Sequence, residues 1–372
     1  MIYLDNGATS FPKPPEVIRA VGRAVMNQGN PGRGGYPAAM EAAKTLFRCR
    51  EAAGNLFGCD PEQVVLTANC TQGLNMAIRT LVRPGDRVVV SGFEHNAVTR
   101  PLHLLGAEVI PAGRKLFDWG NTLDEFSVAL KGKPAAAVFT HVSNVFGYIL
   151  PVEEMSALCR EQGVPFIIDA AQSAGVLPLS LKKLGADFIA MPGHKGLLGP
   201  TGTGLLLCGR LPEVWMAGGT GSDSIRQTMP DFLPDRAEAG TANVPGAAGL
   251  LAGMKEVERV GLENIARRET RCAAQCAGAM EKLGLEVFSG PCQGGTVSFR
   301  APVDCETMAK DLEHRGIALR AGLHCAPLAH ESAGTLDTGT VRVSFGHNAH
   351  PDQAEALIRA VGDVLKKYRR RD

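Results

Sequence analysis

The chain has 372 residues, which predicts two domains at roughly 150 residues per domain. Its 39 Lys and Arg against 38 Asp and Glu leave a net charge of +1. This balance argues against a protein that binds a nucleic-acid backbone, because such proteins need a basic surface. Hydrophobic residues make up 45% of the chain, enough for a sizeable core, so the composition excludes a mainly disordered protein.

The ten cysteines are scattered through the chain, unlike those of a small disulfide-rich secreted protein. Cys272 and Cys276 have no second pair at zinc-ligand spacing, so no metal site is predicted. The first residues, MIYLDNGATSFPKPP, lack the basic and apolar regions of a signal peptide. No apolar run reaches the roughly 18 residues of a membrane span. We therefore expect a soluble, cytoplasmic enzyme with free thiols and no membrane partner.

Short apolar runs alternate with helical patterns over the first two thirds of the chain. The predicted strands cover residues 64–67, 87–91, 135–140, 165–169, 187–191 and 203–207. The predicted helices cover residues 71–81, 99–105, 155–162 and 181–184. The strands are apolar runs rather than alternating patterns, which predicts burial on both faces. Such strands with helices between them predict an α/β fold with a mostly parallel sheet covered by helices.

The character of the sequence changes near residue 245. Residues 247–285 are predicted to form one long helix. The rest is predicted to form strands at 296–299, 317–320 and 340–345 and helices at 306–315 and 351–368. This pattern predicts a smaller C-terminal α+β domain over residues 246–372. The large domain would cover residues 15–245, and residues 1–14 would pack with the small domain.

Two ionisable residues follow neighbouring predicted strands. Asp169 and Lys195 are separated by about one strand–helix–strand unit, and ligands of such sheets bind beyond the C-terminal strand ends. Lys195 lies in MPGHKGLLGPTGTG, whose glycines let the backbone approach a ligand closely. This segment is neither a P-loop nor a dinucleotide fingerprint. A Lys beside an Asp either forms a simple ion pair or serves pyridoxal phosphate, as Schiff-base lysine and partner of the pyridinium nitrogen.

Seven short segments, in order along the chain, carry a family resemblance. They are YLDN at 3–6, EHN at 94–96, HVSNV at 141–145, DAAQ at 169–172, GHK at 193–195, EAGT at 238–241 and RAGLHCA at 320–326. With them the chain resembles the cysteine desulfurases of the class-V aminotransferase superfamily, which are fold-type-I pyridoxal-phosphate enzymes. The resemblance covers nearly the whole chain. It implies pyridoxal 5'-phosphate as the cofactor.

The resemblance also implies a role for each matching residue. The implied catalytic residues are Lys195, which forms the Schiff base and removes a proton, Cys325, and His95, which stacks on the ring and moves protons. The residues implied to bind the cofactor are Cys70, Thr71, His95, Asn144, Asp169, Gln172, His194, Lys195 and Thr241. Of these, Thr71 and His194 are implied to contact the phosphate, and Thr241 to reach the phosphate of the cofactor of the other subunit in a homodimer. Asn144 and Arg342 are implied to hold the substrate carboxylate, a bidentate task that suits Arg.

Cys325 is the residue that would distinguish a desulfurase. Its thiolate would attack the sulfur of the substrate and leave as a persulfide, and flanking cationic or polar groups would favour the thiolate. The other nine cysteines are predicted to be packing residues. The chain departs from the family pattern at Pro192 and Cys70, where Ser or Thr is common, and at Leu323, where many relatives have His. His330, although close to Cys325 in sequence, is not expected to be catalytic.

The predicted activity converts L-cysteine to L-alanine and leaves a persulfide on Cys325 for a sulfur-acceptor protein or small thiol. Selenocysteine lyase, or another class-V aminotransferase-type lyase, is a close alternative. A hydrolase with Cys325 as its nucleophile belongs to a different class and leaves Asp169, Gln172 and Lys195 unexplained. A catalytically silent sulfur-trafficking scaffold meets the same objection. The acceptor and the pathway, whether iron–sulfur cluster assembly, tRNA thiolation or cofactor synthesis, stay open.

Overall fold

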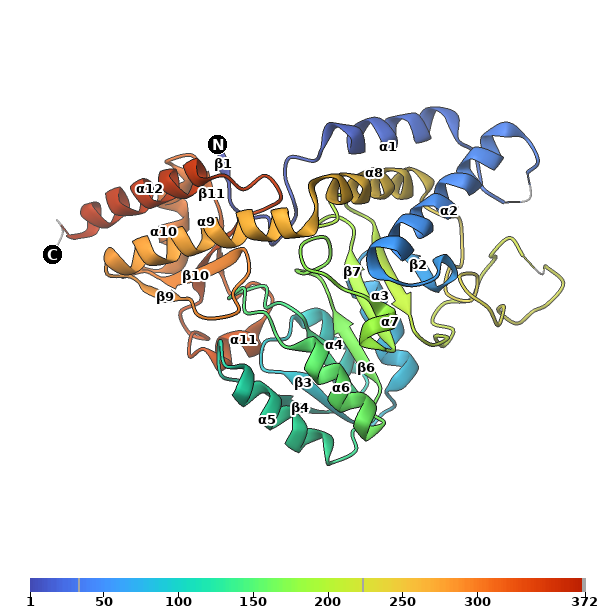
Figure 1. Cartoon of the computed structure of the whole chain (residues 1–372), viewed down its shortest axis with the longest axis horizontal. Helices are drawn as coiled ribbons and strands as arrows, with labels where there is room; N and C mark the ends of the chain where they lie inside the picture. Colours follow the sequence, from blue (N-terminus) through green and yellow to red (C-terminus); the bar gives the residue numbers. More distant parts are fainter. Residues whose placement is uncertain (33, 223, 370–372) are drawn as a thin grey trace.

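The computed structural model describes residues 1–32, 34–222 and 224–369. It has two lobes, one built on a large sheet and one on a small sheet (Figure 1). The chain begins with β1 (Ile2–Tyr3), α1 (Pro15–Asn27), α2 (Pro37–Phe57) and the short 3-10 helix η1 (Pro61–Gln63). Neither α1 nor α2 was among the predicted elements.

The large sheet has the strand order β2-β8-β7-β6-β5-β3-β4. Its strands are β2 (Val64–Thr67), β3 (Arg87–Ser91), β4 (Glu108–Ala112), β5 (Ala136–Thr140), β6 (Phe166–Asp169), β7 (Phe188–Pro192) and β8 (Gly204–Cys208). Strands β4, β3, β5, β6 and β7 run parallel, whereas β8 is antiparallel to both of its neighbours. The predicted α/β class with a mostly parallel sheet is confirmed.

Helices cover both faces of this sheet, as the apolar runs predicted. They are α3 (Cys70–Leu81), α4 (Asn96–Leu104), α5 (Trp119–Leu130), α6 (Val152–Gln162) and α7 (Leu181–Leu184). In β3, Val88 and Val90 join the core under α3 and α4, whereas Val89 joins the core on the opposite face. Strand β4 was not predicted, because it is a half-buried edge strand that contains Pro111.

The predicted single helix over residues 247–285 is wrong. Gly261, with φ 84° and ψ 134°, separates α8 (Val244–Val260) from α9 (Leu262–Lys282). Helix α8 packs on α1 and α2, and Leu250 and Met254 belong to the core of the large sheet. Helix α9 packs instead on the small sheet and on the last helix. The division into domains at residue 245 stays a proposal, and the packing of α8 favours a boundary near Gly261.

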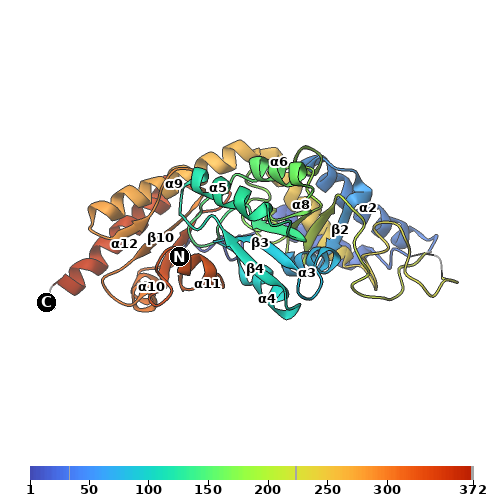
Figure 2. The same ribbon diagram turned by 90° about the horizontal axis from the view of Figure 1, so that it is seen from below.

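The small lobe has a four-stranded antiparallel sheet of order β12-β13-β10-β9. Its elements are β9 (Glu286–Phe288), β10 (Thr296–Arg300), α10 (Cys305–Glu313), β11 (Ile317–Ala318), β12 (Arg320–Gly322), α11 (Pro327–Ser332), β13 (Thr340–Ser344) and α12 (Pro351–Arg369). Figure 2 shows α9 and α12 together on this lobe. The predicted strand at 317–320 is two strands, because β11 pairs with β1 and β12 pairs with β13. No helix in the described part of the chain is long and apolar enough to cross a membrane.

Candidate active site

Asp169 and Lys195 lie at the C-terminal ends of two adjacent parallel strands. Asp169 is the last residue of β6, and β7 leads into the loop that carries Lys195. Asp169 is buried, at 2% exposure. Within the residues that the structure describes, the side-chain amine of Lys195 has no hydrogen-bond or ion-pair partner, so the simple ion pair with Asp169 does not form. Burial lowers the pKa of Lys195 and Asp169 opposes this effect, which favours an amine that loses its proton readily.

The carboxylate of Asp169 accepts two hydrogen bonds on Oδ1, from the Ala171 backbone N at 2.8 Å and from Cys70 Sγ at 3.4 Å. Burial, and secondarily the charge of Asp169, raise the pKa of the Cys70 thiol well above its ordinary value. Cys70 therefore stays a neutral donor to Asp169. Its side chain contacts Asp169, the predicted partner of the cofactor ring nitrogen. Its backbone N lies in the first turn of α3, where the phosphate was predicted to bind.

The N-terminus of α3 offers backbone donors next to this carboxylate. Asn69 caps the helix, and its Oδ1 accepts from the Gln72 N at 2.9 Å. The first N–H groups of a helix have no partner inside the helix, so they suit an anion. Thr71 lies exposed in this first turn. The geometry is suited to the predicted phosphate contact.

His95 occupies the N-cap of α4. Its Nδ1 accepts a hydrogen bond from the Ala97 N at 3.0 Å, so in the neutral ring the proton lies on Nε2. Burial lowers the pKa of His95, and Asp169 opposes this effect. The neighbouring Glu94 is fully buried against Ser91 and the Thr140 N, and burial raises its pKa to about 8. His95 is thus a neutral imidazole, and its Nε2–H, which has no partner among the described residues, can donate to a ligand.

Arg342 and Asn144, the predicted substrate-carboxylate pair, are directly bonded to each other. Arg342 Nη1 donates to the Asn144 carbonyl oxygen at 3.0 Å, and Arg342 Nη2 donates to Asp5 Oδ1 at 2.7 Å. Arg320 binds the other oxygen of Asp5 at 2.9 Å. The Oδ1 of Asn144 and the Nε of Arg342 are buried without a partner in the described structure. The role of Asp5 was not predicted, although it lies in the YLDN segment.

The N-terminal segment also holds the loop before Lys195. The carbonyl oxygen of His194 accepts from the Ser10 N at 3.1 Å and from Lys13 Nζ at 2.6 Å. His194 Nδ1 is 3.0 Å from Thr9 Oγ1, and burial lowers the pKa of His194 to about 4. The imidazole is therefore neutral, and only its Nε2 remains for the predicted phosphate contact.

The Cys325 loop is close to His95 in space. The carbonyl oxygen of Cys325 accepts from the Asn96 N at 2.8 Å, so the loop lies against the start of α4. Cys325 is the exposed cysteine, and the other nine are buried or half-buried, as expected for packing residues. Thr241 is exposed and lines a cavity together with Gln72 and Glu238, and none of the other predicted site residues lines this cavity. The fold thus brings the predicted residues together, except Thr241.

The chain matches the family model of class-V aminotransferases over residues 2–357. It belongs to this family. A probable cysteine desulfurase from Pyrococcus abyssi is 32% identical over 395 residues, covering 99% of this chain and 95% of that protein. One from Methanothermobacter thermautotrophicus is 31% identical over 382 residues, covering 98% and 94%. The solved apo structure of the cysteine desulfurase from Thermococcus onnurineus NA1 has a TM-score of 0.90 at 31% identity, covering 98% and 95%. The resemblance to cysteine desulfurases is confirmed.

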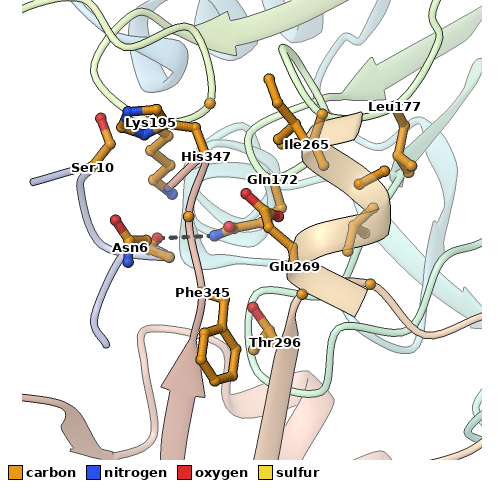
Figure 3. A pocket seen from close by; sticks show the side chains of 18 of the residues that line it. Asn6, Ser10, Gln172, Leu177, Lys195, Ile265, Glu269, Thr296, Phe345 and His347 are labelled. Carbon is orange, nitrogen blue, oxygen red and sulfur yellow. Dashed lines mark hydrogen bonds between the residues drawn. The ribbon is translucent and has the colours of Figure 1, made fainter. Parts of the chain in front are cut away.

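The chain also has a pocket lined by Lys195 that the sequence did not predict. It lies between the two lobes, and Figure 3 shows Lys195 and Glu269 entering it from opposite sides. Gln172 lines the pocket, and its Nε2 donates to the Gly7 carbonyl oxygen at 3.0 Å, which leaves its second N–H for the cofactor. Glu269 is only 7% exposed, and burial raises the pKa of its carboxyl group to about 8. In the sequence it looks like any charged residue of a helix.

Proposed function

We propose that this chain is a pyridoxal-phosphate-dependent cysteine desulfurase that converts L-cysteine to L-alanine and carries the sulfur as a persulfide on Cys325. One observation carries the proposal. The loop of the exposed thiol is hydrogen-bonded to the first residue of α4, directly after His95, at the strand ends that carry Asp169 and Lys195. The proposed nucleophile and a lysine with a lowered pKa would thereby share one site.

The residues at this site fit pyridoxal phosphate. The buried carboxylate of Asp169 suits the ring nitrogen, the unpartnered amine of Lys195 suits a covalent link, and the start of α3 suits the phosphate. His95 would cover the ring and Gln172 would donate to its oxygen. The bound cofactor would supply an electron sink for the substrate.

Each residue then has a task in the reaction. Arg342 and Asn144 bind the carboxylate of L-cysteine, and Lys195 removes the proton from the substrate Cα and returns one to the same carbon when L-alanine forms. The Cys325 thiolate forms an S–S bond with the substrate sulfur as the C–S bond of the substrate breaks. The carbon that loses sulfur gains a proton and becomes the methyl group of L-alanine. The neutral imidazole of His95 is placed to hold or pass that proton through Nε2.

We further propose that the protein is a cytoplasmic homodimer that passes its persulfide to an acceptor protein or small thiol. Support for the dimer comes from large apolar side chains exposed on or just before α2 and in the segment between β8 and α8. They are Tyr36, Phe47, Trp215, Met216, Ile225 and Phe232. Phe47 and Met216 line the same cavity as Thr241, which suits a Thr241 that serves the cofactor of the other subunit. Light scattering should give twice the chain mass.

Two variants of the purified holoenzyme test the proposed activity. Cys325→Ala should keep the yellow colour of the bound cofactor but lose sulfide release from L-cysteine. Cys292→Ala, which removes a half-buried thiol elsewhere, should keep both. Lys195→Ala should lose the colour. Unchanged sulfide release by Cys325→Ala, or a colourless protein that cannot take up pyridoxal phosphate, would contradict the proposal.

A further inference from the structure

His324 and Cys325 are adjacent residues that share an unusual backbone conformation but have opposite environments. Their φ angles are 50° and 57°, in the left-handed region that residues with a Cβ rarely adopt. His324 is only 9% exposed, whereas Cys325 is exposed. Such a conformation persists only where the surroundings hold it. The structure must therefore contain contacts that keep the imidazole inside and the thiol outside.

Three hydrogen bonds hold this pair from three sides. Asn144 Nδ2 donates to the His324 carbonyl oxygen at 2.9 Å, and the Asn96 N donates to the Cys325 carbonyl oxygen at 2.8 Å. The third joins the His324 side chain to strand β13, with Nε2 3.2 Å from the Thr340 carbonyl oxygen and 3.5 Å from Thr340 Oγ1. Two of these bonds fix the backbone, and only the third uses the side chain of His324.

The third bond determines the chemical state of His324. A carbonyl oxygen only accepts hydrogen bonds, so Nε2 must carry the proton. The Nδ1 atom is then an acceptor, and it is buried without a partner in the described structure. Burial, and secondarily Arg342 and His330, hold the pKa of His324 well below its ordinary value. His324 is neutral, so it cannot serve as the cationic neighbour that the sequence offered for the Cys325 thiolate.

His330 packs against the ring of His324. The two rings stack with centroids 5.9 Å apart and planes 29° apart. His330 is fully buried, and its Nδ1 is 2.7 Å from Thr335 Oγ1. Phe146 also packs against His330, with ring centroids 5.8 Å apart. The imidazole of His324 is therefore held by the His330 ring and by Thr340.

The same contacts join the Cys325 loop to the residues that bind the substrate carboxylate. Asn144 donates to the His324 carbonyl oxygen and accepts from Arg342 Nη1 at 3.0 Å. Thr340, which accepts from His324, lies on β13 together with Arg342. Cys325 and the two residues proposed to bind the substrate carboxylate, Asn144 and Arg342, are therefore connected by one hydrogen-bond network.

We propose that His324 is the positioning residue of the persulfide-carrying loop, a neutral imidazole that ties the loop to β13 and sets Cys325 against the bound substrate. The proposal rests on the proposed role of Cys325. His324 touches neither substrate nor cofactor in it, and it acts only by holding the next residue in place. It neither donates nor removes a proton during the reaction.

Two variants of the holoenzyme separate the hydrogen bond from the packing. His324→Phe keeps a flat ring on His330 but has no donor. His324→Asn keeps an N–H donor, and Asn tolerates the left-handed conformation better than most residues. The readouts are kcat and KM for L-cysteine, the absorbance of the bound cofactor, and the rate at which iodoacetamide alkylates Cys325. Alkylation of Cys292 in the same sample is the internal reference.

For His324→Phe we expect kcat to fall roughly tenfold to a hundredfold, the range for a misplaced reacting group, with KM nearly unchanged. The cofactor absorbance should be unchanged, and Cys325 should be alkylated faster because its loop is released. His324→Asn should recover much of the wild-type kcat and alkylation rate. Equal behaviour of the two variants, or wild-type values in His324→Phe, would overturn the proposal. Activity that survives in Cys325→Ala would instead overturn the role of Cys325 itself.

Discussion

The buried guanidinium of Arg342 donates to the carboxylate of Asp5 at 2.7 Å, across 337 positions of the chain. Asp5 is 8% exposed and Arg342 is 2% exposed, so neither group has much contact with water. Arg342, which is predicted to bind the substrate carboxylate, is therefore oriented by Asp5 of the N-terminal segment. That segment also contacts the loop of Lys195 through Ser10 and Lys13.

Asp5→Asn should destabilise the protein by about 3 to 5 kcal/mol, because the variant leaves the buried charge of Arg342 without its counter-charge. The KM for L-cysteine should rise as well, since the guanidinium of Arg342 loses the contact that orients it. Urea unfolding measures the first effect and steady-state kinetics the second. Glu16→Gln, which breaks the exposed pair with Arg19, is the control and should change neither. Equal effects of the two substitutions would contradict the assigned role of Asp5.

Cys70→Ala should weaken binding of pyridoxal phosphate by about twofold to tenfold, the effect of losing one hydrogen bond to Asp169. Cys70→Ser keeps a donor of similar size and should bind the cofactor nearly as tightly as the wild type. Absorbance titration of the apoprotein with pyridoxal phosphate measures both. If the Ala and Ser variants bind equally, the contact between Cys70 and Asp169 does not contribute to cofactor binding.

Glu269→Gln should change how stability depends on pH. Burial raises the pKa of the Glu269 carboxyl group to about 8, from an ordinary value of 4.5. Between these pH values the folded protein holds a proton that the unfolded chain releases, so stability falls as pH rises through this window. Glutamine does not titrate, so the stability of the variant should fall less than that of the wild type over this pH window.

At pH 9 the free energy of unfolding of Glu269→Gln should exceed that of the wild type by roughly 1 to 3 kcal/mol, and this difference should be smaller at pH 5. Urea unfolding at several pH values measures the difference. Glu281→Gln, on the exposed side of the same helix, is the control and should leave the pH dependence unchanged. A constant difference between Glu269→Gln and wild type across this range would contradict the buried, protonated state.

Gly261→Ala should destabilise the protein by about 1 to 3 kcal/mol, because Ala is strained at φ 84°. Gly278→Ala is the matched control inside α9, where an added Cβ meets nothing within 4 Å, and it should stabilise by about 0.5 to 1 kcal/mol. Thermal unfolding of both variants measures the contrast. If both substitutions stabilise, residues 247–285 behave as the single helix that the sequence predicted.

Most of the large sheet and the position of its site were predictable from sequence. Buried parallel strands are continuous apolar runs, and their C-terminal ends carry the ligand-binding residues, so Asp169 and Lys195 were placed on neighbouring strands. Periodicity was less informative for β4, a half-buried edge strand, and for Gly261, since a Gly is tolerated inside a helix as well as at its end.

The sequence by itself thus determined the fold class, the family and most candidate residues, because local patterns of apolar residues and short motifs carry that information. Only the tertiary structure decided which partners those residues have. It paired Arg342 with Asp5, turned His324 inward and Cys325 outward, and enclosed Glu269 in the pocket of Lys195. These contacts join distant segments, and burial changes the charge state of side chains, so no local pattern in the sequence encodes them.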